Sequence, residues 1–175
     1  FLKIPSIINE TIPFVIIVSI ALYNCSVKYS LTGASISPET KTFQVNYFQN
    51  NSTLIEPGID RDFTNKLIDL LINQTSLDLV KSNGDLLYEG EIVEYRISPT
   101  TATANNTAAQ NRLTISVNVR FIDKSDSEAE FEKRFSFYYD YPGSSQLIGS
   151  QKDAAIDEIF ERITQDVFNA SLAKW

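Results

Sequence analysis

The chain has no histidine and no methionine, and it has a single cysteine, Cys25. Without histidine it lacks the commonest general base and the commonest zinc ligand of proteins. One cysteine excludes an intrachain disulfide, so cysteine usage says nothing about the redox compartment. The sequence also lacks a glycine-rich phosphate loop, a cluster with metal-ligand spacing and a Ser–His–Asp set. We therefore expect no enzymatic activity, no catalytic or metal-binding residues and no cofactor.

Positive charge is scarce as well, because 15 Lys and Arg stand against 22 Asp and Glu, a formal net charge of −7. Nonspecific binding to DNA or RNA takes most of its affinity from a basic surface. We therefore expect no nucleic-acid partner. A hydrophobic content of 43% excludes a disordered chain and is typical of a globular one.

The sequence has no apolar run of the ~20 residues that a transmembrane helix requires. Its longest run, Ile12–Tyr23, is interrupted by Pro13 and Ser19 and ends just before Cys25. That length is typical of the apolar region of a signal peptide. The pattern predicts a bacterial lipoprotein in which residues 1–24 are the signal peptide and Cys25 becomes the acylated N-terminus.

The segment before Cys25 departs from the usual processing signal at one position. Leu22 lies three residues before the cysteine, as expected, but Asn24 stands where Gly, Ala or Ser is usual. Two other interpretations of Cys25 remain. A free cysteine packed in a core strand is common, but it leaves the apolar run unexplained. A retained transmembrane anchor conflicts with the length of the run.

Residues 25–175 are expected to form one periplasmic domain, since about 150 residues support a single core. Alternating apolar and polar residues predict strands at 27–33, 41–49, 77–81, 85–97, 111–123 and 130–141. Apolar residues at helical spacing predict helices at 60–76 and 151–170. One-sided strands with two amphipathic helices predict an α+β fold, a two-layer sandwich with a mostly antiparallel sheet and both helices packed on one face.

Local signals predict how several of these elements begin, turn and face. Asn83-Gly84 is a strong hairpin signal and would join strands 77–81 and 85–97. We expect Asp60 and Asp62 to cap the first helix, and Ser150 with Asp153 to form a capping box on the second. Alternation predicts one buried row in each strand: Phe43, Val45 and Tyr47; Leu113, Ile115, Val117, Val119 and Phe121; Phe131, Phe135, Phe137, Tyr139 and Tyr141.

Three features invite a functional interpretation. Glu89, Glu91 and Glu94 would suit a glycosidase, but a solvated strand face is the better interpretation, as is usual for lone carboxylates. The 123–128 segment is similar to a calcium loop but lacks the glycine and glutamate spacing of an EF-hand, which favours a hairpin loop. Tyr138 is predicted to point away from the helices, where an aromatic side chain is suited to docking on a partner.

Four segments resemble the Bacteroidetes branch of the LptE family, the lipopolysaccharide-assembly lipoproteins of the outer membrane: CSVKYSLTGASI at 25–36, KTF at 41–43, NRLTI at 111–115 and AKW at 173–175. The resemblance implies a lipid anchor at Cys25 in the periplasmic leaflet of the outer membrane. It further implies an α+β domain that plugs an LptD β-barrel, helps to assemble it and assists lipopolysaccharide transport. Only Cys25 is carried over as a functional residue.

Two functions thus remain open from the sequence. One is the barrel plug, and the other is a periplasmic lipoprotein that binds a ligand or scaffolds a different envelope complex. An acidic protein needs a local cationic patch to bind an anionic glycolipid. Antiparallel pairing would place Arg96 and Arg112 at the same end of the sheet, beside a polar 100–110 loop, and arginine suits phosphate. We predict that they contact lipopolysaccharide; the alternative is that they are solvated strand-end residues.

Overall fold

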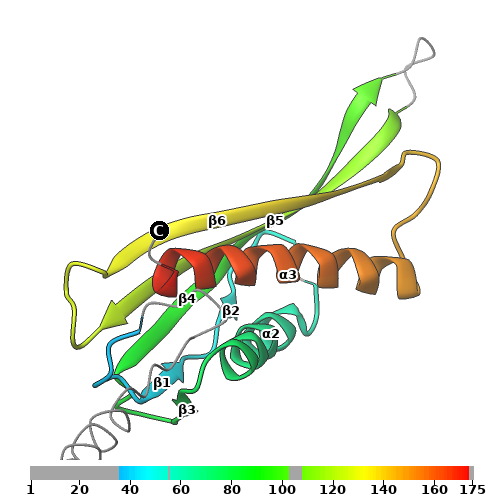
Figure 1. Cartoon of the computed structure of the whole chain (residues 1–175). Coiled ribbons are helices and arrows are strands. Elements are labelled where there is room, and N and C mark those ends of the chain that lie inside the picture. Colours follow the sequence, from blue (N-terminus) through cyan, green and yellow to red (C-terminus); the bar gives the residue numbers. More distant parts are fainter. Residues whose placement is uncertain (1–35, 55, 103–107, 174–175) are drawn as a thin grey trace, which may run out of the picture. The chain divides into compact units, whose positions relative to one another are not determined.

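The computed structural model of the chain describes residues 36–54, 56–102 and 108–173. Six strands and two helices follow one another along this part of the chain (Figure 1): β1 (Thr42–Val45), β2 (Gln49–Asn50), α2 (Ile59–Gln74), β3 (Asp78–Leu79), β4 (Leu86–Ala102), β5 (Ala108–Asp123), β6 (Phe131–Pro142) and α3 (Gly149–Leu172). The strand predicted at 27–33 and the acylation site Cys25 lie outside the described residues.

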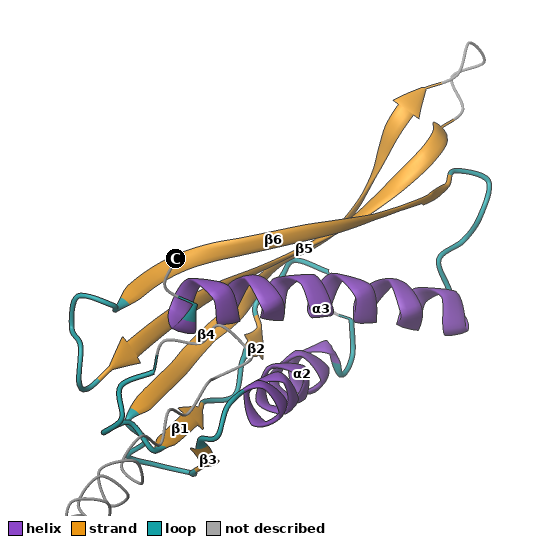
Figure 2. Cartoon of the chain, in the orientation of Figure 1, coloured by secondary structure: helices purple, strands orange, loops and turns teal. Residues whose placement is uncertain are grey.

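The strands form one mixed sheet in the order β3-β1-β4-β5-β6, with β2 beside β4 (Figure 2). The long pairs β4–β5 and β5–β6 are antiparallel. The short strands β1, β2 and β3 pair in parallel. Both helices lie on one side of the sheet, with α3 along β5 and β6 and α2 beside α3, near β2 and β3 (Figure 1). The predicted two-layer α+β fold is confirmed.

The core fills the space between sheet and helices, and the predicted apolar rows form most of it. Every residue of the predicted row in β5 is buried, as are the helix residues Phe63, Leu67 and Leu71 in α2 and Ile156, Ile159, Phe160, Ile163 and Val167 in α3. Edge-to-face ring contacts link Phe48 to Phe63 at 5.1 Å and Phe63 to Phe160 at 5.2 Å. These aromatic contacts join the sheet to α2 and α2 to α3.

A buried hydrogen bond fixes the end of α3 on the sheet. The Tyr88 hydroxyl of β4 lies 3.0 Å from Ser171 Oγ, and both residues are buried. Burial raises the pKa of Tyr88 well above its usual value, so this hydroxyl stays neutral. A polar group with a partner can therefore remain in the apolar layer.

The predicted hairpin at Asn83-Gly84 is wrong. Strand β3 does not pair with β4, because β1 lies between them and pairs in parallel with both, Phe43 standing opposite Leu79 on one side and Leu86 on the other. Asn83 does adopt a left-handed backbone, φ 63°. Gly84 does not, so only one of the two positions that a type I′ turn requires is left-handed. The segment instead crosses from one side of β1 to the other.

The strand predicted over 41–49 is interrupted after Val45. Phe48 is fully buried, whereas Tyr47 is 54% exposed, so the predicted facing of Tyr47 is wrong. The Phe48 N–H donates to Thr64 Oγ1 of α2 at 3.1 Å instead of to a neighbouring strand. A helix side chain thus takes the place of a strand partner and lets Phe48 turn into the core.

Both predicted helix caps are wrong as well. Helix α2 begins after Gly58, whose φ of 89° is left-handed, and no side chain caps it. Asp60 and Asp62 lie inside its first turn, where negative charge still favours a helix N-terminus. Helix α3 begins after Ile148, also without a side-chain cap, so Ser150 lies within the helix. Within the described part of the chain, no helix has the length and apolarity to cross a membrane.

Candidate interaction surface

The side of the sheet that faces away from the helices is polar throughout its centre. Odd-numbered residues of β5 face the core, so its even-numbered residues face outward, and the cross-strand register extends this pattern to β6. We call this surface the open face, and its charged and aromatic members are Glu89, Glu91, Glu94, Arg96, Arg112, Arg120, Glu132, Arg134, Tyr138 and Asp140.

A β-bulge in β4 decides which charges share the open face. Ile92 stands opposite Val117 and Glu94 opposite Ser116, so Val93 is an extra residue on β4. Strict alternation would put Glu94 on the opposite face from Glu89 and Glu91. The bulge reverses the alternation, and all three carboxylates therefore lie on the same face.

Glu94 is the centre of a charged cluster on this surface. Its carboxylate accepts hydrogen bonds from Arg96 Nε at 2.8 Å and Arg134 Nη2 at 2.5 Å, and Ser116 Oγ lies 2.8 Å away. The hydrogen bond from Arg96 is the largest cause of the lowered pKa of Glu94, so this carboxyl is ionised at neutral pH. Two guanidinium groups share one carboxylate, which leaves an excess of one positive charge.

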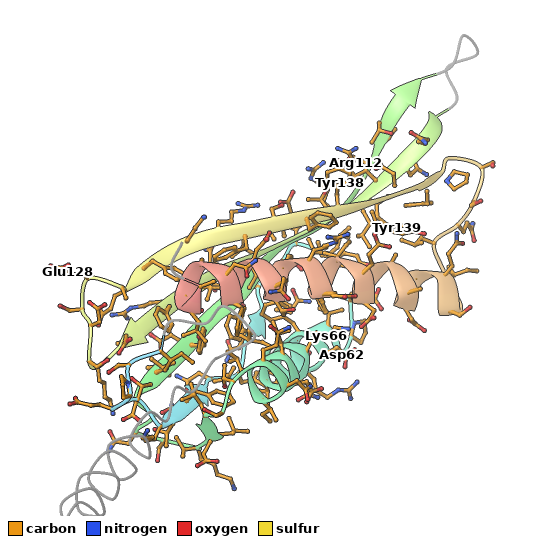
Figure 3. All side chains as sticks on the ribbon, viewed as in Figure 1. Asp62, Lys66, Arg112, Glu128, Tyr138 and Tyr139 are labelled. Atoms are coloured by element: carbon orange, nitrogen blue, oxygen red, sulfur yellow. The ribbon has the colours of Figure 1, made fainter. Side chains whose placement is uncertain are left out.

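Arg112 has a different environment on the same face. Its Nε and Nη2 donate to the two carboxylate oxygens of Asp140 at 2.7 and 2.8 Å. Its guanidinium also lies 3.5 Å from the centroid of the Tyr138 ring, and the two side chains are side by side in Figure 3. The hydrogen bonds from Arg112 lower the pKa of Asp140. This pair is bidentate and its charges balance.

Glu89 and Glu91 on the open face also have partners. The Glu89 carboxylate accepts hydrogen bonds from Arg120 Nη1 at 3.3 Å and Asn46 Nδ2 at 3.1 Å. The Glu91 carboxylate accepts one from Asn51 Nδ2. These contacts agree with the interpretation of the three glutamates as a solvated polar face. Within the described ranges, no group of three or more Asp, Glu, His or Cys is arranged to hold a metal ion.

The structure brings Arg96 and Arg112 onto one face but not to the base of a loop. Arg96 stands opposite Thr114 and Arg112 opposite Ser98, so the two are diagonal neighbours inside their strands. The predicted 100–110 loop is wrong at both ends, because β4 continues to Ala102 and β5 begins at Ala108. The strands extend because a two-stranded ribbon needs only mutual backbone hydrogen bonds. The polar composition of the 100–110 segment therefore did not prevent strand formation. Residues 103–107 lie outside the described part.

The remaining predictions for this region agree with the structure. Tyr138 is 46% exposed on the open face. The 123–128 segment is the connection of the β5–β6 hairpin, where Asp123 Oδ1 accepts hydrogen bonds from the N–H and the hydroxyl of Ser125. The carboxylate therefore orders a turn. Sequence reasoning missed Arg134 as a member of the charged cluster, because its proximity to Glu94 depends on the bulge.

A family model described as "LptE: Lipopolysaccharide-assembly" matches residues 40–171. This chain belongs to the LptE family. Membership places it in the lipopolysaccharide-assembly machinery of the Gram-negative envelope, as an assembly protein and not an enzyme. A search of curated proteins gives no sequence match to this LptE-family chain.

Solved structures share the fold of this LptE-family chain at low sequence identity. The hypothetical protein CT253 from Chlamydia trachomatis has a TM-score of 0.53 at 12% identity, covering 77% of this chain and 99% of its own. Protein XCC0632 from Xanthomonas campestris has a TM-score of 0.50 at 10% identity, covering 79% and 88%. The rare lipoprotein B from Shewanella oneidensis has a TM-score of 0.46 at 11% identity, covering 73% and 89%. The first two support the α+β fold.

Proposed function

We propose that this chain is an outer-membrane lipoprotein, anchored through Cys25 on the periplasmic side, that plugs an LptD-type β-barrel. In this role it helps to assemble the barrel and assists lipopolysaccharide transport to the cell surface. The family match over residues 40–171 is the observation that carries the proposal. The specific barrel, the membrane and the orientation go beyond that match and need their own tests.

The open face supports a role inside a barrel on physical grounds. The lumen of an outer-membrane barrel is polar, and a plug must present polar groups to it. Most charged side chains of the open face are engaged in ion pairs or hydrogen bonds, chiefly with one another. Such a surface can lie against a polar wall with few of its charges left without a partner.

Copurification from detergent-solubilised outer membrane tests the barrel partner. We expect the tagged full chain to recover a large outer-membrane β-barrel in a stable stoichiometric complex. A different envelope complex in its place would support the alternative, a ligand-binding or scaffolding lipoprotein. Recovery of the chain alone, from membranes in which the barrel is present, would reject the plug.

Acylation of Cys25 is tested separately by intact mass. We expect the membrane form to begin at Cys25 and to carry lipid, and Cys25→Ala to give a soluble or unprocessed species. A membrane form that retains residues 1–24 without lipid would contradict the anchor. This outcome does not depend on which partner the domain binds.

Direct lipopolysaccharide contact by Arg96 and Arg112 is a further part of the proposal. Both side chains lie on the open face, but their electrostatic surroundings differ. Asp140 balances Arg112, whereas Glu94 leaves an excess positive charge with Arg96 and Arg134. A phosphate group would therefore bind more readily at the Arg96–Arg134 pair, with Arg112 in support.

Variants of the purified complex separate these contributions. We expect Arg96→Ala with Arg112→Ala to weaken lipopolysaccharide binding and to leave the barrel bound. Adding Arg134→Ala should weaken it further, and affinity in the parent should fall with salt, since screening acts on exposed charges. Parent affinity in the triple variant would reject the site. Loss of the barrel would assign these arginines to the protein interface instead.

A further inference from the structure

Strand β6 is a long edge strand with one side open. In the sheet order it pairs with β5, and within the described residues no strand pairs with its other side (Figure 2). It runs over Phe131–Pro142, and its register with β5 is unbroken. A long regular edge presents a row of unpaired backbone groups to any strand that can approach it.

The other edges of the sheet carry features that discourage pairing. Strand β3, at the far edge, has only two residues. Strand β4 is an inner strand up to Ile92, where its pairing with β2 ends; from there on its register is irregular, at Ile92/Glu94 and at Pro99/Thr101. Short edges, bulges and proline all hinder addition of a further strand. The centre of β6, Phe135–Tyr139, has none of them and is aromatic and uncharged, a composition that favours strand association.

The hydrogen-bond pattern identifies which backbone groups of β6 face outward. Lys124 N–H donates to Asp85 C=O at 3.0 Å, which makes these two residues a hydrogen-bonded pair at the end of the β4–β5 ladder. Because such pairs alternate along an antiparallel ladder, even-numbered residues of β5 bond to β4 and odd-numbered ones bond to β6. The β5–β6 register then directs outward the backbone groups of the even-numbered residues of β6, namely Glu132, Arg134, Ser136, Tyr138 and Asp140.

We propose that β6 pairs antiparallel with β6 of a second copy of this chain, with Phe137 opposite itself. The outward backbone groups of one copy must meet those of the other, so even-numbered residues must stand opposite even-numbered ones. Centring on Phe137 satisfies this condition and places Arg134 opposite Asp140 twice, where the contact would add to the ion pairs that these residues already make with Glu94 and Arg112. Opposite charges at facing positions favour a register.

Two neighbouring registers also let the outward N–H and C=O groups of the two β6 strands meet, but their facing side chains are less favourable. Centring on Ser136 places Glu132 opposite Asp140, and facing like charges destabilise a pair. Centring on Tyr138 places Arg134 opposite Pro142 and gives no facing pair of opposite charges. Charge complementarity therefore selects Phe137 as the centre.

Side chains on the helix side of β6 also match across this pairing. Phe135 would stand opposite Tyr139, and Phe137 opposite its own counterpart. Phe137 and Tyr139 are only partly buried in one copy and are packed against the core. A second copy would extend this row of rings and remove more of it from water, which favours association.

Single-cysteine cross-linking of the full chain in detergent tests the register. A non-hydrogen-bonded facing pair has Cα atoms about 4.5 Å apart, within the span of a disulfide. Phe137→Cys should therefore give a disulfide-linked species of twice the mass, at about tenfold the yield of Ser136→Cys or Tyr138→Cys. Every variant is made in the Cys25→Ala chain, which contains no other cysteine and gives the background.

Two further variants keep the test independent of the Phe137 side chain. Chains with Phe135→Cys and chains with Tyr139→Cys should cross-link when mixed, and neither should do so alone. Adding Ser136→Pro to Phe137→Cys should abolish the cross-link while the thermal unfolding transition remains, because the Ser136 N–H faces outward and holds no bond to β5.

Each other outcome overturns the proposal. Preferred cross-linking through Ser136→Cys or Tyr138→Cys would mean that the register is wrong. A disulfide to a different protein in place of a doubled mass would mean that the edge receives another partner. Yields at the background level for all variants, with unfolding transitions like that of the parent, would mean that β6 does not pair with a second copy.

Discussion

Asp85 shows how one side chain can order the start of a strand. Its Oδ2 accepts hydrogen bonds from the N–H groups of Lys41 and Thr42, both at 2.9 Å, and from the Thr42 hydroxyl at 2.8 Å. The N–H of Lys41 is the largest cause of the lowered pKa of Asp85. Its ionised form is thus favoured by folding.

The pKa of Asp85 gives a prediction for the pH dependence of stability. Since the folded pKa lies below the unfolded one, the stabilisation is present above the ordinary carboxyl pKa of about 3.9 and is lost as pH falls through the folded pKa. We expect Asp85→Asn to lower the free energy of unfolding at pH 7 and to differ much less from the parent near pH 2. Urea unfolding at both pH values measures this.

Asp69 is exposed, so Asp69→Asn is the matched control. This substitution should leave the free energy of unfolding nearly unchanged at both pH values. An equal loss for Asp85→Asn at pH 7 and pH 2 would mean that its charge is not responsible. Sequence analysis did not single out Asp85, because its donors are more than 40 residues earlier in the chain and their proximity depends on the crossing beside β1.

At the scale of elements, the periodic patterns were the most reliable guide. The apolar rows of β5 and α3 were predicted residue by residue, since burial of one face directly dictates alternation or helical spacing. The Asn83-Gly84 hairpin was wrong because turn residues favour a local φ and ψ but do not decide which strands pair; Gly84 does not adopt the positive φ that the hairpin turn requires. The bulge at Val93 was missed because an extra residue in one strand is defined only by the strand that it faces.

The middle of α3 provides a test of the core assignment. Ile159 is fully buried, so Ile159→Ala should lower the free energy of unfolding by about 2–4 kcal/mol. Its neighbour Glu158 is exposed, and Glu158→Ala should change it by less than about 0.5 kcal/mol. Chemical denaturation measures both, and similar losses in the two variants would mean that the helix faces are assigned wrongly.

The bulge predicts an unusual tolerance to deletion. Removing Val93 would join Ile92 to Glu94 and leave Tyr95 facing the core and Arg96 facing outward, as they do now. Removing Asn118 from the regular part of β5 would put Val119 and Phe121 on the opposite face from Leu113, Ile115 and Val117. We expect the Val93 deletion to give a folded domain and the Asn118 deletion to give an unfolded one.

Thermal unfolding followed by circular dichroism compares the two deletion variants. A cooperative transition in the Val93 deletion, and its absence in the Asn118 deletion, is the expected result. If the Val93 deletion unfolds as well, the extra residue in β4 is needed for more than the reversal of the alternation.

For the molecule as a whole, the sequence predicted the two layers, but not the surface that matters for binding. The fold class depends on which elements are amphipathic, and that property is local. The open face depends on long-range register: Arg134 and Glu94 meet only because β4, β5 and β6 are aligned as they are. The pairing of Arg112 with Asp140 has the same origin. Without that register, Arg96 and Arg112 looked like two free cations near a loop.

Delivery of newly made lipopolysaccharide to the cell surface is the most direct test of the proposed role. Cells depleted of this chain would be pulse-labelled, and the labelled lipopolysaccharide accessible at the surface would be compared with that in undepleted cells. We predict that surface delivery falls, that assembled barrel is lost with it, and that the full chain restores both while Cys25→Ala does not. Undiminished delivery after depletion, with the barrel assembled as before, would contradict the proposal.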